Sequence, residues 1–337
     1  MKNIIKSIVA IISIAAIVSC VDVDERADNN VENFEALWSV LDQKYCYFDY
    51  KNKEYGLDWN QVYAKYRPLV SDTLNEVELF NLFDSMLDEL RDGHVNLVSY
   101  FNTSRYWDWQ ENYPSNFSDT LQRKYLGTNY AMVGGLKYGV FMPDSIAYVY
   151  CGSFSSGFSD NNLTYMLYLL SPAKGLILDI RSNGGGDLTM SERLAARFTE
   201  EKILTGYMRH KTGSGHSDFS DYDAQYLKPF NGVRWKKPVV VLTNRGVYSA
   251  ANQFVNMMKC CPNVKIVGDK TGGGGGMPFN NELPNGWTVR FSACPCYDKD
   301  KKDIEFGIEP DYYVSITDED FNRGKDTIIE FAIDLLK

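Results

Sequence analysis

The stretch that decides the fold is Leu176-Ile-Leu-Asp-Ile-Arg-Ser-Asn-Gly-Gly-Gly186, in which a continuous run at 176–180, apolar but for Asp179, leads into a glycine-rich turn. A continuous run of this kind is typical of a β-strand that is covered on both faces. Residues 188–198 have a helical pattern, and a second apolar run at 239–242 precedes a predicted helix at 249–258. Strands that alternate with helices predict an α/β domain with a mainly parallel sheet, which we assign to residues 171–337.

The chain before this domain divides into two regions with different sequence patterns. Residues 33–98 carry apolar side chains at helical spacing, which predicts a small helical N-terminal domain that ends in a strand-like run. Residues 99–170 are rich in aromatic side chains and irregular in pattern, with short strands expected at 138–142 and 146–150. We interpret this region as a connection between the helical domain and the α/β domain.

The first residues predict export. Lys2 and Lys6 supply a basic start to a short apolar run that ends at Ile17-Val18-Ser19-Cys20. A basic start, an apolar run and a small residue before the cleavage point are typical of a signal peptide, here residues 1–19. The run is short for a membrane span, which needs ~20 apolar residues. Residues 20–32 are acidic and polar, which predicts an unfolded tether.

The end of the signal peptide resembles the lipobox of bacterial lipoproteins, in which the cysteine is acylated and becomes the first mature residue. The resemblance implies that Cys20 carries the lipid, palmitate included. It also implies an anchor in a membrane of the bacterial cell envelope, with the outer membrane favoured, facing the periplasm or the exterior. An ordinary secreted protein with a chance cysteine at the cleavage point is the alternative.

The charge and the cysteines limit the classes of partner. The formal net charge is −9 and no segment concentrates lysine or arginine into a stripe, so we expect no nucleic-acid partner. In an exported chain, Cys260 or Cys261 could form a disulfide with Cys294 or Cys296, or all four could be buried thiols. A zinc site is disfavoured because Cys-Pro-Cys lacks the usual gap and the three histidines lie elsewhere.

Ser249 is the candidate nucleophile. It follows a predicted buried strand by a short turn and opens a predicted helix. Backbone N–H groups at a helix N-terminus are unpaired and can receive the negative oxygen of a carbonyl under attack. Glycines at 184–186 let the backbone approach a ligand, and one of their N–H groups could complete an oxyanion hole. The alternative is that Ser249 is only a helix N-cap, a common role for serine.

Four motifs, taken in order, resemble the tail-specific, or C-terminal processing, serine peptidase family. They are residues 179–186 after the buried strand, Ser249-Ala250, residues 267–271 before a run of glycines, and residues 307–311. The resemblance covers roughly residues 75–337. It implies a spiral α/β fold like that of the Clp protease subunit and crotonase, with Ser249 as the nucleophile.

The glycine loop resembles that of one branch of the family. In the better-known branch a lysine in this loop is the base, but Gly274 occupies the corresponding position here. The loop is similar to that of the branch of the tricorn core and the interphotoreceptor retinoid-binding protein. Tricorn takes a histidine base from an N-terminal helical segment. This resemblance implies that His94, in Gly93-His94, is the general base and that Glu305 orients it, with Asp303 left open as the orienting acid.

Other side chains are weaker candidates for the base. His210 and His216 lie in a polar segment at 205–226, which predicts a solvated surface excursion. Lys270 is the fallback, but it follows Asp269 and has the pattern of a surface residue. Histidine suits the task because its ordinary pKa lies near neutrality, and a serine hydroxyl needs an adjacent base.

The predicted activity is hydrolysis of peptide bonds in a peptide or protein substrate, without a metal or a cofactor. His94 would take the Ser249 proton in an acyl-enzyme mechanism. The N–H of Ala250 and one N–H from Gly184, Gly185 or Gly186 would hold the oxyanion. Two alternatives share the fold, namely an inactive lipid- or peptide-binding protein and an acyl-CoA enzyme of the crotonase type. Neither needs Ser249, His94 and an acid together.

Overall fold

The computed structural model describes residues 26–141 and 145–337. The predicted signal peptide, the acylated Cys20 and the first part of the tether lie outside these residues. Within the described ranges, no helix is both long enough and apolar enough to cross a membrane. Helix α1, Asn30–Lys44, begins inside the predicted tether, so the helical part starts slightly earlier than expected.

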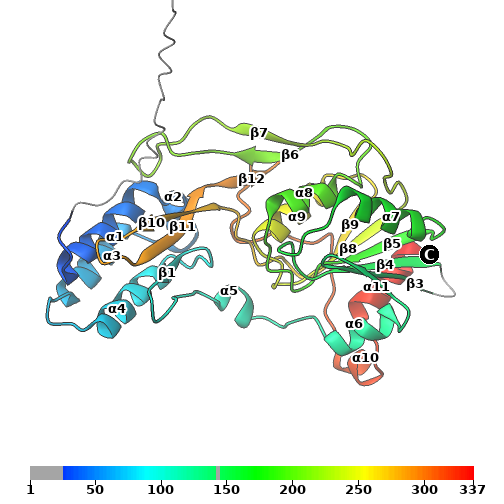
Figure 1. Ribbon diagram of the computed structural model, residues 1–337, viewed down its shortest axis with the longest axis horizontal. Helices are drawn as coiled ribbons and strands as arrows, with labels where there is room; N and C mark the ends of the chain where they lie inside the picture. The colour runs from blue at the N-terminus through cyan, green and yellow to red at the C-terminus, as the bar shows by residue number, and fades with distance from the viewer. Residues whose placement is uncertain (1–25, 142–144) are drawn as a thin grey trace, which may run out of the picture.

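A seven-stranded mixed sheet forms the centre of the larger part of the molecule (Figure 1). Its strands are β2 Ala131–Val133, β3 Leu136–Phe141, β4 Ile146–Cys151, β5 Gly175–Asp179, β8 Val239–Thr243, β9 Val264–Gly268 and β13 Tyr312–Tyr313. They lie in the order β13-β9-β8-β5-β4-β3-β2, parallel from β13 to β4 and antiparallel beyond. The predicted mainly parallel sheet is confirmed. Because β2, β3 and β4 belong to it, the sheet begins well before residue 171.

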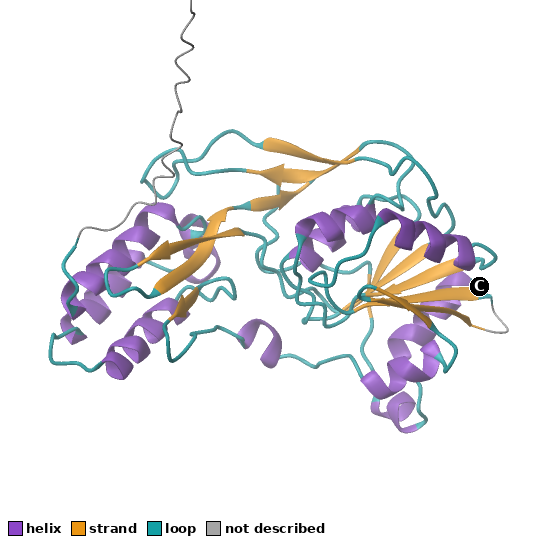
Figure 2. Cartoon of the chain, in the orientation of Figure 1, coloured by secondary structure: helices purple, strands orange, loops and turns teal. Residues whose placement is uncertain are grey.

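Helices cover both faces of this sheet (Figure 2). Helices α7 Asp160–Leu170, α8 Leu188–Ala195 and α9 Ala250–Lys259 pack on one face, and α6 Asp119–Leu126 and α11 Thr327–Leu336 pack on the other. A short helix, α10 Asp318–Asn322, precedes α11. Successive strand residues point to opposite faces, so Leu176 and Leu178 enter the first core while Ile177 enters the second. Burial on both sides explains the nearly unbroken apolar run in the sequence.

The smaller part combines the N-terminal helices with a hairpin from the C-terminal half (Figure 1). Its helices are α1, α2 Phe48–Tyr55, α3 Trp59–Tyr66, the 3-10 helix η1 Arg67–Leu69 and α4 Glu76–Asp88. They pack on a three-stranded antiparallel sheet of β1 Asn96–Val98, β11 Thr288–Cys294 and β10 Met277–Glu282. Val289 and Phe291 of the hairpin are buried in the same core as Phe80 of α4. The helical part is therefore complete only with residues 277–294.

A second three-stranded sheet bridges the two parts at the top of Figure 1. It consists of β6 Ile203–Met208, β7 Asp223–Leu227 and β12 Cys296–Asp298. The predicted excursion at 205–226 is largely this ribbon and its connecting loop. His216 was expected to be solvated, but its Nε2 lies 2.8 Å from Asp42 Oδ1 and its ring stacks on Phe48. The ribbon is thereby tied to α1 and α2.

The cysteines of the described ranges 26–141 and 145–337 are all free thiols. Of the two alternatives drawn from the sequence, a disulfide and unpaired thiols, the structure has the second. Cys261 is buried, and Cys260, Cys294 and Cys296 are partly buried.

Candidate active site

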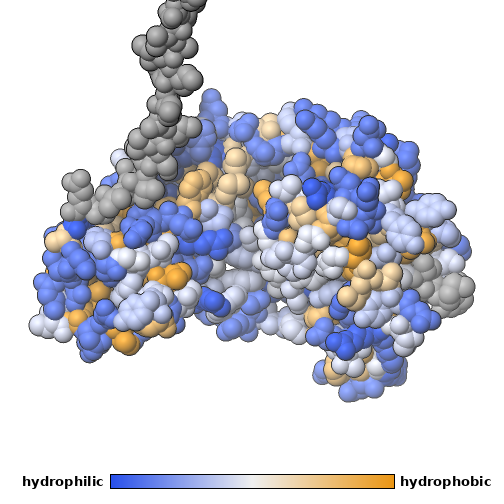
Figure 3. All heavy atoms as spheres, viewed as in Figure 1, coloured by the Kyte–Doolittle hydropathy of each residue, from blue (hydrophilic) through white to orange (hydrophobic). Residues whose placement is uncertain are grey.

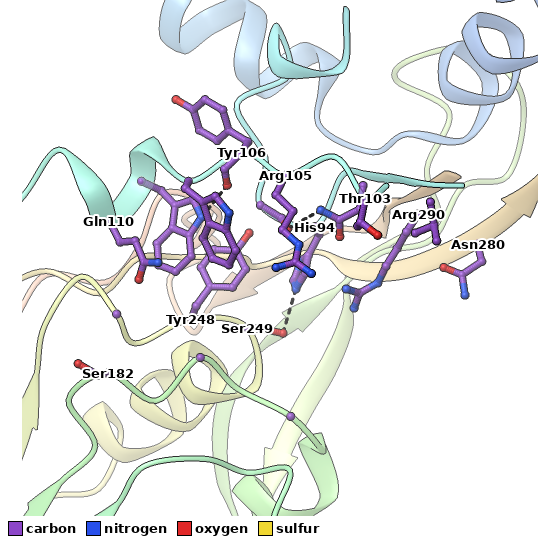
Figure 4. A pocket seen from close by; sticks show the side chains of 18 of the residues that line it. His94, Thr103, Arg105, Tyr106, Gln110, Ser182, Tyr248, Ser249, Asn280 and Arg290 are labelled. Atoms are coloured by element: carbon purple, nitrogen blue, oxygen red, sulfur yellow. Dashed lines mark hydrogen bonds between the residues drawn. The ribbon is translucent and has the colours of Figure 1, made fainter. Parts of the chain in front are cut away.

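Ser249 sits in a tight turn between β8 and α9. Its backbone lies in an unusual region, with φ of 56° and ψ of −121°, which a non-glycine residue adopts only at a cost. Its side chain makes no capping hydrogen bond to the helix. Instead, Ser249 Oγ lies 2.9 Å from His94 Nε2 (Figure 4). The N-cap alternative is therefore wrong, because the hydroxyl faces the histidine rather than the start of α9.

Neighbouring loops hold the strained turn in place. The Ser249 N–H donates to the Gly273 carbonyl at 2.9 Å, and the Tyr248 N–H donates to the Asn183 carbonyl at 3.0 Å. A β-carbon on Gly185, whose φ is +101°, would lie 2.9 Å from the Ser249 β-carbon. The two glycine-rich loops found in the sequence are thus packed directly against the serine, and glycine is required where the backbones meet.

The same loops supply backbone N–H groups beside the serine. Within the described residues, the N–H groups of Ala250, Gly184 and Gly186 donate no hydrogen bond. Gly185 was expected to be a donor, but its N–H already donates to Asn183 Oδ1 at 3.0 Å. Gly184 and Gly186 both line the cavity in front of Ser249, whereas Gly185 does not. Ala250 together with Gly184 or Gly186 is the set that remains for an oxyanion.

His94 lies at the junction between α4 and β1. Arg91 has a positive φ of 45° in the turn after the helix, and Asp92 Oδ1 accepts the His94 backbone N–H at 2.8 Å. The imidazole packs against Tyr248, with ring centroids 5.0 Å apart, and Tyr248 stacks on Trp109 at 4.2 Å. Burial lowers the pKa of His94 to about 4; the Asp92 charge opposes this shift, and the Arg290 charge adds to it. The ring is therefore neutral near pH 7, as a general base must be.

A buried ion cluster lies behind the histidine. Lys51 Nζ, on a fully buried side chain of α2, is 3.3 Å from Glu305 Oε1 and 3.8 Å from Asp92 Oδ2. Asp92 Oδ2 also accepts the Tyr45 and Ser292 hydroxyls, each at 2.9 Å. Burial is the largest influence on Asp92 and opposes its ionisation, but Lys51, His94 and the hydrogen bonds from the His94 N–H and the Ser292 hydroxyl together lower the pKa of Asp92. Burial and the Asp92 charge raise the pKa of Glu305. Asp92 is the carboxylate that carries the charge.

The expected orienting acid does not contact the histidine. Glu305 Oε2 accepts the Gly275 N–H at 2.9 Å, and its other oxygen faces Lys51, so it fixes the glycine loop instead. Asp303 accepts the Glu305 backbone N–H, and burial raises its pKa to about 7. His94 Nδ1 makes no hydrogen bond with any residue that the structure describes. The carboxylate nearest to His94 in the chain and in contact with its backbone is Asp92, which the sequence reasoning missed.

The other candidate bases lie elsewhere. Lys270 Nζ pairs with Glu309 at 3.0 Å, and Lys270 lines a different pocket from that of Ser249. Gly274, at the position where the lysine branch has its base, has a φ of +74°, and a β-carbon there would lie 2.5 Å from the Tyr248 ring. A lysine side chain at this position would therefore displace the tyrosine that packs on His94.

Ser249 and His94 face a cavity of about 880 Å³ between the two parts of the molecule. The surface is visibly hollowed there (Figure 3). The sheet part contributes Ser249 and the glycines, the helical part contributes His94, and the segment around α5, Asp108–Glu111, contributes aromatic side chains. Figure 4 shows Arg105 and Arg290 reaching in from the helical part. The site is thus assembled from both cores.

Comparison with known proteins agrees with this arrangement. The family model for peptidase family S41 matches residues 145–314, and the model for the tricorn protease C1 domain matches residues 27–88. A solved structure, described as a putative peptidase from Parabacteroides merdae, is 53% identical with a TM-score of 0.88, over 92% of this chain and 97% of that one. The matches therefore cover both the N-terminal helices and the part that contains the seven-stranded sheet.

Two further relatives are proteases by name. The carboxy-terminal processing protease CtpA of Bacillus subtilis is 28% identical over 147 residues, 43% of this chain and 30% of the relative. The tricorn protease of Thermoplasma acidophilum is 29% identical over 179 residues, 52% of this chain and 15% of the relative. Each match covers less than a third of the relative's own length. Family model, fold and site together establish that this chain belongs to peptidase family S41, a family of serine peptidases.

Proposed function

We propose that the protein is a serine endopeptidase that hydrolyses peptide bonds through an acyl-enzyme on Ser249, with His94 as the general base. The observation that carries the proposal is the 2.9 Å contact between Ser249 Oγ and His94 Nε2. The low pKa of His94, caused chiefly by burial, keeps Nε2 able to accept a proton at neutral pH. A serine in a strained turn beside a neutral histidine is the arrangement that nucleophilic catalysis requires.

The reaction follows from these positions. Ser249 Oγ forms a bond to the peptide carbonyl carbon while its proton passes to His94 Nε2. The negative oxygen that results lies against the N–H groups of Ala250 and of Gly184 or Gly186, which donate to nothing else in the described residues. The C–N bond then breaks, and His94 returns the proton to the leaving amine. Water hydrolyses the acyl-enzyme by the same proton path in reverse.

The lipid- or peptide-carrier alternative is disfavoured by the strain at Ser249. A binding protein gains nothing from a positive φ at a serine whose hydroxyl faces a buried neutral histidine. The aromatic side chains that line the cavity, such as Trp107 and Trp109, are compatible with either function. The Ser249–His94 pair therefore supports the peptidase over the carrier.

Labelling with a fluorescent fluorophosphonate tests the proposal. The wild-type protein is expected to label, and Ser249→Ala and His94→Ala are expected not to. His210→Ala is the matched control, because this histidine lies in the β-ribbon segment outside the cavity. Labelling that persists in His94→Ala would refute His94 as the base, and labelling that persists in Ser249→Ala would refute the nucleophile.

We also propose that Cys20 is acylated and that the protein is anchored to a membrane of the bacterial cell envelope. The support is the sequence from Ile17 to Cys20, with its preceding basic and apolar segments. Metabolic labelling with an alkyne fatty acid should mark the wild type, and Cys20→Ala should lose the label. Incorporation that is unchanged in Cys20→Ala contradicts the proposal.

A further inference from the structure

The cavity in front of Ser249 has a charge opposite to that of the whole protein. Its described lining contains two arginines, Arg105 and Arg290, and no aspartate or glutamate. The protein as a whole has a formal net charge of −9. Charged groups of one sign that line a cleft raise the local concentration of ligands of the other sign. The cleft therefore attracts an anionic group that the rest of the surface repels.

Arg290 is held in the cavity wall by its strand. Along β11, Val289 and Phe291 point into the N-terminal core, where they are almost fully buried, so Arg290 between them points to the opposite face. Asn96 of β1 and Asn280 of β10 lie directly opposite Arg290 in the register, and all three line the cavity. The guanidinium group thus stands in a row of polar side chains and cannot turn into the core.

Arg290 has no acidic partner in the part of the chain that the structure describes. Within residues 26–141 and 145–337, its guanidinium group makes neither an ion pair nor a hydrogen bond, although it is only partly exposed. Arg105 is exposed, and its guanidinium group lies 5.8 Å from the centre of the Trp107 ring. A partly buried guanidinium group without a partner has lost part of its hydration without a replacement. Its planar donors match a carboxylate, which they can bind through two parallel hydrogen bonds.

Arg290 also lies close to the reacting groups. It lines both the main cavity and a smaller hollow of about 140 Å³, and Ser249 lines both of these too. Figure 4 shows Arg105 and Arg290 on the side of the cavity that contains His94, with both guanidinium groups near the Ser249–His94 pair. Because Arg290 lines two hollows that both reach Ser249, the position suits a side chain next to the cleaved bond better than a distant chain end.

We propose that the substrate carries an aspartate or glutamate next to the bond that is cleaved, and that Arg290, assisted by Arg105, binds its carboxylate. This inference rests on the proposed peptidase function and specifies its substrate class. Arg290 provides most of the selectivity because its strand fixes it, whereas Arg105 is exposed and screened by solvent.

Matched fluorogenic peptides test the inference. They differ only in carrying Glu, Gln or Lys beside the cleaved bond, and each is made with a free and with an amidated C-terminus. The expected kcat/KM for Glu exceeds that for Gln by about 10- to 100-fold, the range of a hydrogen bond to a charged group. Arg290→Gln should abolish this preference, Arg290→Glu should favour Lys, and Arg105→Gln should reduce the preference less. Arg323→Gln is the control for net charge, because Arg323 is exposed and pairs with Glu319.

Three results would overturn the inference. They are equal cleavage of the Glu and Gln peptides by the wild type, a Glu preference that survives in Arg290→Gln, and a preference that follows the free C-terminus alone. Binding of the same peptides to Ser249→Ala, followed by the fluorescence of Trp107 and Trp109 in the cavity, separates this inference from the proposed function. If Ser249→Ala binds the Glu peptides more tightly and the wild type cleaves none of the peptides, the carboxylate site is supported and the peptidase is refuted.

Discussion

The buried Lys51 allows a quantitative test of the ion cluster behind His94. Replacement by methionine keeps the volume of the side chain and removes its charge. Among the described residues, Asp92 and Glu305 then have no cation within 4 Å. Asp92 then has two ways to remain buried, as an uncompensated anion or as the neutral acid. Protonation is the cheaper of the two, because an isolated carboxylate in the interior is very costly.

The cost of that protonation depends on pH. The ordinary pKa of aspartate is about 3.9, and each pH unit above it costs about 1.36 kcal/mol. Lys51→Met should therefore lower the free energy of unfolding by about 4 kcal/mol at pH 7 and by only about 1.5 kcal/mol at pH 5. The sign follows from linkage. In the variant the folded-state pKa of Asp92 lies above its unfolded value, so stability is lost as pH rises.

Urea unfolding at pH 5 and at pH 7 measures both values. We assign the charge to Asp92 rather than to Glu305. In an Asp92→Asn background, Lys51→Met should therefore lower the free energy of unfolding much less than in the wild type. A Glu305→Gln background should not have this effect. Lys65→Met is the matched control, because Lys65 forms an exposed ion pair with Glu89 and should have little effect at either pH. If Lys51→Met lowers the free energy of unfolding equally at both pH values, this assignment of charge is refuted.

Three further predictions concern the site and its support. The rate of fluorophosphonate labelling should fall as the pH drops through about 4, the pKa of His94. Arg290→Gln should move the midpoint of this pH profile upward, because it removes a positive charge near His94. A midpoint near 6.5 in the wild type contradicts the argument that burial lowers this pKa. Gly185→Ala should slow labelling about 100-fold, because its β-carbon would lie 2.8 Å from the Tyr248 carbonyl oxygen; an unchanged rate contradicts the packing. Arg181→Met, between the buried Asp179 and Asp326, should cost about 3–5 kcal/mol in urea unfolding; a loss below about 1 kcal/mol contradicts a paired charge.

Much of the α/β part could be predicted because its signals are local. The run at 176–180 is apolar at every residue except Asp179, which predicts a strand with helices on both faces, and β5 is such a strand. The role of residues 277–294 could not be predicted in this way. Their alternating pattern indicates a hairpin, but nothing local in β11 specifies that its partner is β1, about 190 residues earlier in the chain. Non-local pairing of this kind leaves no trace in the periodicity of either strand.

The same distinction applies to the site. Ser249 and His94 lie in short motifs with the right neighbours, and the structure brings them into contact. Lys51 lies in a helix rich in charged residues, a pattern that predicts exposure, yet it is fully buried because carboxylates from two distant segments surround it. Arg290 has the pattern of a solvent-facing residue on a half-buried strand, and only the fold turns that face into a cavity wall. Of the site residues that the sequence analysis missed, Asp92 is the one that its place in the chain, two residues before His94, could have suggested.

The division of the site between two cores also affects when activity can first appear. His94 is made early during synthesis, but the core that holds it lacks Val289 and Phe291 until the hairpin emerges near the end of the chain. The Ser249 turn likewise awaits the loop that contains Gly273. A nascent chain therefore has no assembled Ser249–His94 pair while most of it is still being translated. Chains that stop before Met277 should not react with a fluorophosphonate, and in the cell this order delays proteolysis until the whole molecule has folded.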